Sequence, residues 1–171
     1  DGGEIKEVLN RINKLKLSKL SENLLFEVLF TNSYPPKKNL NSEEFLKIKI
    51  NWLIKNKRFT DLETLLKNNN EARKQTKAIK LLVNEDLASA NIKSACEKTQ
   101  LLAKGINNDY LDKFLIYCLI KDKRKDEAQL LFDLTQERGL KDKFFEDKFY
   151  YLLGVIEKTN QKVSDKNILN F

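Results

Sequence analysis

Histidine and methionine are absent from this 171-residue sequence, and cysteine occurs only twice. Without histidine the chain has no Ser-His-Asp or Cys-His nucleophile, and it lacks the commonest general base and metal ligand. Two cysteines without histidine also fall short of the four ligands of a structural zinc site. We therefore expect a protein that is not an enzyme, with no metal or other cofactor and no small-molecule substrate.

Glycine and proline are also scarce, with five and two residues respectively. The glycines are scattered and form neither a G-x-G-x-x-G nor a G-x-x-x-x-G-K-[ST] phosphate-binding run. Both prolines are adjacent, at Pro35 and Pro36, whereas a β-rich chain of this length would use such residues at many turns. The stretches without charge are far shorter than the roughly 18 apolar residues of a membrane span. These features favour an all-α fold without a transmembrane segment.

What the sequence has instead is apolar residues at helical spacing, separated by short polar breaks. A first helix is predicted from about Ile5 to Lys19, and Ser21 is the expected N-cap of a second helix that ends near Thr31. Further helices are predicted at 44–56, 60–69, 72–84, 87–104, 109–121, 126–138 and 142–157. The pattern indicates stacked antiparallel helical hairpins, with about eight helices in all.

We expect a single helical domain over residues 1–171. Residues 1–38 would form an N-terminal helical cap that ends in the Pro-Pro linker, and Trp52 should be buried against this cap. Residues 39–157 would hold three helix-turn-helix repeats and one further helix. The pattern over residues 158–171 predicts the start of a next helix, so we expect the chain to be a fragment of a longer protein.

Three breaks between helices align as an internal repeat. Leu53-Ile54, Leu81-Leu82 and Leu119-Ile120 occupy matched positions, at offsets of 28 and 38 residues that average 33. The alternative is a chance alignment of generic amphipathic helices.

The best-matched pair carries Ala128 and Phe132, which reproduce the A-x₃-F step of tetratricopeptide repeats. From about residue 42 to residue 154 the chain resembles a degenerate tetratricopeptide array. The resemblance implies a stack of helix pairs that serves as a non-enzymatic scaffold for binding a protein or peptide, or for assembly.

Cys96 and Cys118 lie on consecutive predicted helices, eleven residues on either side of Asn107. Both should therefore sit at one height, roughly 16 Å from the bend between the helices. We predict that they face each other across one helical hairpin, either as a disulfide or as two free buried thiols in a reducing compartment. The bond would favour a periplasmic or exported location over a cytoplasmic one.

A fainter resemblance covers nearly the whole chain. The order of an N-terminal helix pair, a Pro-Pro linker and short pairs carrying Ala95-Cys96 and Tyr117-Cys118 is similar to bacterial helical-repeat proteins, some of them exported. That family has no assigned activity, so the resemblance implies a location and a fold but no function.

Aromatic residues concentrate late in the sequence. Phe144 and Tyr151 share one face of the predicted helix 142–157, Tyr150 lies beside that face, and Phe171 ends the sequence. A helix that is apolar over so much of its girth needs neighbours on more than one side. We interpret these four residues as a candidate surface for a partner or for self-association, with an ordinary core as the alternative.

The formal net charge is +7, and lysine supplies 27 of the 32 basic residues. Lysine alternates with acidic residues along most of the predicted helices, which is typical of solvated faces and not of a clustered nucleic-acid surface. The mixed charge and the few arginines favour a protein or peptide partner over nucleic acid. The alternative function is binding of a polyanion, a nucleic acid or a membrane surface, through lysine-rich faces such as that of Lys14, Lys16 and Lys19.

Overall fold

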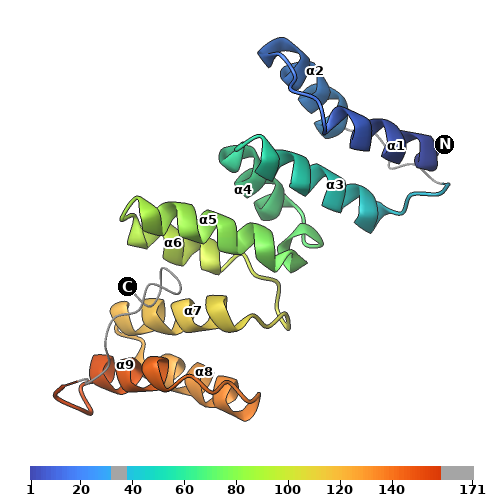
Figure 1. Cartoon of the computed structure of the whole chain (residues 1–171). Helices are drawn as coiled ribbons and strands as arrows, with labels where there is room; N and C mark the ends of the chain where they lie inside the picture. The colour runs from blue at the N-terminus through green and yellow to red at the C-terminus, as the bar shows by residue number, and fades with distance from the viewer. Residues whose placement is uncertain (32–37, 159–171) are drawn as a thin grey trace. The chain divides into compact units, whose positions relative to one another are not determined.

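The computed structural model describes residues 1–31 and 38–158 (Figure 1). Over these residues the chain forms nine α-helices, one short 3₁₀ helix (Ala72–Lys74) and no strand, which confirms the all-α prediction. The helices are α1 (Gly2–Ile12), α2 (Lys19–Phe30), α3 (Ser42–Lys55), α4 (Phe59–Asn68), α5 (Thr76–Ala88), α6 (Ile92–Thr99), α7 (Asp109–Lys121), α8 (Lys125–Glu137) and α9 (Lys143–Leu153). The residues from 159 onward, where a further helix is predicted to begin, lie outside the described part of the chain.

The chain divides into two compact units, Asp1–Ala72 with α1 to α4 and Arg73–Phe171 with α5 to α9. In the first unit α3 packs against α4. In the second unit α5 packs against α6 and α7 against α8, while α6 also contacts α7 and α9 contacts α7. Successive helix pairs of the second unit therefore stack in chain order. The single domain and its N-terminal cap stay predictions.

The first two helices both begin earlier than the sequence pattern predicts. The first predicted helix, from Ile5 to Lys19, is wrong at both ends because α1 begins at Gly2 and ends at Ile12. Ser21 is not the N-cap of α2: Ser18 is extended there, and its Oγ accepts a hydrogen bond from the backbone N–H of Ser21 at 3.2 Å. A serine three residues upstream thus satisfies a free N–H of the first turn.

Trp52 is buried against α2, as predicted. Its side chain is only 2% exposed, and its ring lies 6.1 Å from that of Phe26 and 6.2 Å from that of Phe30, between centroids. The guanidinium of Arg58 lies 3.5 Å from the centre of the Phe26 ring. Aromatic packing therefore fixes one face of α2 on α3.

In the second unit the predicted break at Asn84–Asp86 is wrong, because α5 runs through these residues to Ala88. The predicted helix 87–104 is wrong as well, because α6 spans only Ile92–Thr99. The chain then continues to α7 without regular structure, held in part by a hydrogen bond from the Ala103 N–H to the Arg73 carbonyl at 3.2 Å. The break after α5 carries no glycine or proline to mark it, and the glycine that follows α6, Gly105, lies six residues beyond the last residue of that helix.

The same turn joins the helices of three hairpins. Lys57, Ala90 and Lys123 all have left-handed backbone, with φ of 53°, 55° and 62°. In each turn the N–H of this residue donates a hydrogen bond to the carbonyl three residues before it. The N–H of the next residue donates to the carbonyl five residues before itself, and all six donor–acceptor distances are 2.8–3.1 Å. This Schellman pattern satisfies the carbonyls at the end of one helix, and the residue after the left-handed one is the N-cap of the next helix. The three turns recur at a spacing of 33 residues.

The spacing of the turns corrects the sequence alignment. The residue four positions before each left-handed residue is Leu53, Asp86 and Leu119 in turn. Leu53 and Leu119 thus have the same place relative to their turns, whereas Leu81 lies five residues before the corresponding residue, Asp86. Asp86 is acidic where the other two hairpins carry leucine, so a comparison of apolar residues does not identify this position.

Candidate interaction surface

The late aromatic residues that the structure describes differ in their burial. Phe149 is core: its ring stacks on that of Phe132 with centroids 4.0 Å apart. Tyr150 packs edge-on against the same Phe132 ring at 5.8 Å and is half-buried. Tyr151 is 46% exposed, and Phe144 is half-buried, with the Lys148 ammonium 5.6 Å from its ring centre.

Of the four candidates, Phe144 and Tyr151 lie together on one side of α9, and Tyr150 belongs to the edge of the core. Phe171 lies outside the described residues. In the last turn of α9, Leu153 packs against the core, whereas Leu152 is 40% exposed. Among the described candidates, Tyr151 is thus the exposed aromatic side chain, and the four-residue surface stays a prediction.

A second set of polar and aromatic side chains, all half-buried, lies on α5 and α7. We call it the α5–α7 face and define it by Lys80, Asn84, Tyr110, Lys113 and Tyr117. The Tyr110 hydroxyl donates a hydrogen bond to the Asn84 Oδ1, and the Lys80 ammonium lies 4.2 Å from the centre of the Tyr110 ring. Burial raises the pKa of Tyr110 to about 12, so its hydroxyl stays a hydrogen-bond donor at neutral pH.

The other end of the α5–α7 face is also ordered by its neighbours. The Lys113 ammonium forms an ion pair with Asp142 and lies 5.7 Å from the centre of the Phe145 ring. Burial alone would raise the pKa of Asp142, but the hydrogen bonds from Lys113 and from the backbone of Phe145 lower it overall. Asp142 also caps α9, so the ion pair fixes the start of that helix.

Tyr117 completes the face by stacking on Phe114, with ring centroids 5.8 Å apart. None of the five residues of the face was singled out from the sequence as a binding residue. The signal that would have found them is the 33-residue spacing, because Lys47, Lys80 and Lys113 occupy equivalent positions on α3, α5 and α7.

Cys96 on α6 and Cys118 on α7 form a disulfide, with Cα atoms 5.7 Å apart. The bond joins the second helix of one hairpin to the first helix of the next, and not the two helices of a single hairpin. The prediction of equal height assumed a helix that reaches residue 104, whereas α6 ends at Thr99. Both thiols meet nevertheless because α6 packs against α7.

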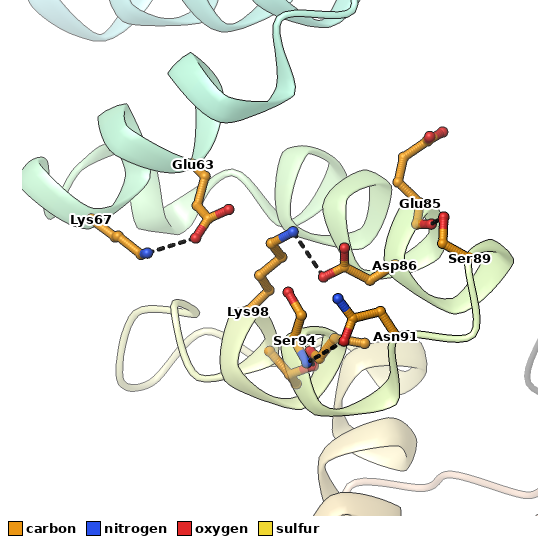
Figure 2. A network of polar contacts seen from close by, with 10 residues as sticks. Glu63, Lys67, Glu85, Asp86, Ser89, Asn91, Ser94 and Lys98 are labelled. Carbon is orange, nitrogen blue, oxygen red and sulfur yellow. Dashed lines mark hydrogen bonds and ion pairs between the residues drawn. The ribbon is translucent and has the colours of Figure 1, made fainter.

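Two carboxylates are buried in ion pairs. Asp112 is 6% exposed and accepts a hydrogen bond from the Arg138 Nη2 at 2.8 Å. In the other pair, the Lys98 ammonium lies 2.8 Å from Asp86 Oδ2, with both side chains about one-seventh exposed (Figure 2). Lys98 supplies a charge there but no well-aligned hydrogen bond to this oxygen. These pairs join neighbouring helices, which is a structural role.

Substitution of Asp112 tests the cost of burying its charge. Burial raises the pKa of Asp112 above its usual 3.8, and the hydrogen bond and charge of Arg138 offset this only in part. The folded state therefore binds the proton more tightly than the unfolded state does, and the stabilisation present at low pH is lost as pH rises through the raised pKa.

Asp112→Asn should accordingly gain stability relative to the wild type between about pH 4 and about pH 7. Arg138 is one-third exposed, so water can solvate its guanidinium in the variant. Urea unfolding of both proteins across this range measures the difference. A difference that stays constant with pH, or that favours the wild type increasingly at neutral pH, would contradict the assignment.

The first unit holds an open pocket lined by Ser42, Glu43, Phe45, Leu46, Lys49, Asn69 and Glu71. The Lys49 ammonium lies between two rings, 4.6 Å from the centre of Phe45 and 5.4 Å from that of Phe30. Burial lowers the pKa of Lys49. The pocket supplies one cation on an aromatic floor, which is not a catalytic arrangement.

Across residues 1–31 and 38–158, no group of three or more cysteine, histidine or acidic side chains is placed to hold a metal ion. In the same residues, no helix is long and apolar enough to cross a membrane. Comparison with protein-family models, with curated proteins and with solved structures finds no match to this chain.

Proposed function

We propose that this chain is a helical-repeat scaffold, similar to tetratricopeptide arrays, that binds a protein or peptide through the α5–α7 face. The recurrence of one turn at Lys57, Ala90 and Lys123 supports the repeat. Its spacing of 33 residues is close to the tetratricopeptide period of about 34.

Equivalent core positions support the repeat as well. Ile50, Val83 and Ile116, on the first helix of each hairpin, are all buried. On the second helix of each hairpin, the position of the alanine in the A-x₃-F step recurs at the same spacing. It is held by Leu62, Ala95 and Ala128, and each of these is 0% exposed. Stacked repeats of this kind form an extended concave surface to which equivalent helices contribute.

The observation that carries the binding proposal is the chemistry of the α5–α7 face. Tyr110 and Tyr117 offer aromatic area at a low cost in side-chain entropy, and tyrosine is enriched in protein interfaces. Lys80 has no ion pair among the described residues, so its ammonium is available to a carboxylate. Asn84 adds an amide beside it. The face suits a peptide segment that carries acidic and apolar side chains.

A charge reversal at Lys80 tests the proposal. A photo-crosslinking residue at position 117 would first capture the partner, and binding of the purified partner would then be titrated. Lys80→Glu should raise the dissociation constant at least about tenfold, because it places like charges together in the interface. Lys104→Glu is the matched control, since Lys104 is exposed in the connection between α6 and α7. Equal affinities for the two variants would contradict the proposal.

A further inference from the structure

The second helix of the first unit is apolar on two opposite sides. Its inner side carries Phe26 and Phe30, which pack on Trp52, together with the buried Leu29. Its outer side carries Leu20, Leu24 and Val28 at four-residue spacing, and these are 71%, 56% and 68% exposed. A helix that is apolar all round is normally covered on all sides, so the outer stripe requires an explanation.

The outer stripe extends beyond α2 at its N-terminal end. Leu15, in the turn that precedes α2, is 61% exposed, and Val8 on α1 is 52% exposed. We call the set of Leu15, Leu20, Leu24 and Val28 the outer ridge. Isolated exposed leucines are ordinary, but three aliphatic side chains in one row on α2, with Leu15 in the preceding turn and Val8 on α1 also exposed, add up to an apolar area that water solvates poorly.

Positive charge surrounds one end of the outer ridge. Lys14, Lys16 and Lys19 are all exposed and alternate in sequence with Leu15 and Leu20. No ion pair with another described residue neutralises these three lysines. Arg11, by contrast, is paired with Glu7 at 2.6 Å. The turn between α1 and α2 therefore combines protruding leucines with three uncompensated cations.

We propose that the outer ridge and its three lysines dock on the surface of an anionic lipid bilayer. Aliphatic side chains that enter the acyl boundary, flanked by lysines at the level of the phosphates, are the features that hold a peripheral protein in the interfacial region. Lysine stems are long enough to keep their ammonium groups at the headgroups while the leucines insert.

The composition of the ridge favours lipid over other macromolecules. Energetically dominant residues of protein interfaces are mainly tryptophan, tyrosine and arginine, and lysine is depleted there. The ridge has only leucine, valine and lysine. Nucleic acid would be bound through phosphate contacts and aromatic stacking, which gives no reason to expose a row of aliphatic side chains.

Co-sedimentation with vesicles tests the proposal on the full chain. The wild type should bind vesicles of phosphatidylcholine mixed with phosphatidylglycerol, and not phosphatidylcholine alone, and binding should weaken as salt rises. Leu15→Ser with Leu20→Ser should weaken binding at least about tenfold, because two inserted side chains are lost. Lys14→Gln, Lys16→Gln and Lys19→Gln together should weaken it about a hundredfold.

Matched variants in the second unit provide the controls. Leu130→Ser removes a leucine of α8 that is 62% exposed, and Lys93→Gln, Lys104→Gln and Lys121→Gln together remove the same charge from exposed positions. Both should bind vesicles as the wild type does. All substituted side chains are exposed, so circular dichroism should show unchanged helix content.

Three results would overturn the proposal. The first is equal binding to neutral and anionic vesicles, or none to either. The second is a weakening by the control variants as large as that by the ridge variants. The third is a concentration-dependent dimer that Leu15→Ser with Leu20→Ser abolishes, without vesicle binding, because a second copy of the chain would then be the occupant.

Discussion

Lys98→Leu alone is expected to lower the free energy of unfolding by about 3 kcal/mol, and adding Asp86→Leu is expected to restore most of it. The two side chains form the buried ion pair between α5 and α6 (Figure 2). Removing one partner leaves a carboxylate without a cation in a site about one-seventh exposed, and that desolvation cost is not compensated.

The expected rescue follows from the 33-residue spacing. The positions equivalent to Asp86 hold Leu53 and Leu119, and those equivalent to Lys98 hold Leu65 and Leu131. The hairpins α3–α4 and α7–α8 therefore place an aliphatic pair where α5–α6 places an ion pair. A buried ion pair can often be replaced by well-packed apolar side chains without loss of stability.

Urea unfolding of the wild type, both single variants and the double variant gives the coupling energy directly. Leu65→Ala, at the position equivalent to Lys98 in the first hairpin, measures the ordinary loss of stability when an aliphatic side chain is truncated there. A double variant no more stable than Lys98→Leu alone would contradict the equivalence of the three hairpins. It would also remove one support for the repeat.

Reduction of the disulfide is expected to lower the free energy of unfolding by about 3 kcal/mol. The bond between Cys96 and Cys118 closes a loop with a sequence separation of 22, and a cross-link of this length restricts the unfolded chain by about that amount. For a chain of this size, the change corresponds to a fall in melting temperature of about 6–12 °C.

Thermal unfolding with and without reductant measures the effect on one sequence. The control is Cys96→Ala with Cys118→Ala, whose melting temperature should not respond to reductant. Titration of the denatured, unreduced protein should find no reactive thiol. Two reactive thiols, or an unchanged melt on reduction, would show that the pair is not oxidised, and a periplasmic or exported location would lose its main support.

The sequence predicts best those helices whose ends carry strong signals. Helix α7 is predicted at its observed bounds, because Asn108 caps its start and a polar run follows Lys121. Gly139 is the left-handed residue after α8, as its position suggests. Ala90 occupies the same conformation with no glycine to announce it, so the end of α5 was placed too early.

The candidate surfaces were harder to predict than the helices, for a physical reason. Periodicity identifies which residues share a face, but not which face a neighbour covers. Leu20, Leu24 and Val28 have core spacing yet lie exposed, while Tyr150 packs on Phe132. The α5–α7 face depends on a contact between Tyr110 and Asn84, and no local pattern encodes that contact.

The three left-handed turns also have an evolutionary consequence. Residues 59–75 and 92–108 are equally long, although the helix in the second segment is two residues shorter and its connection two residues longer. The two segments therefore divide the same number of residues differently between helix and connection. An insertion within a turn would break both of its hydrogen bonds and rotate the next helix, whereas an insertion between hairpins falls in a connection outside the α-helices. Length variation among natural variants should therefore accumulate between hairpins and be purged from the turns within them.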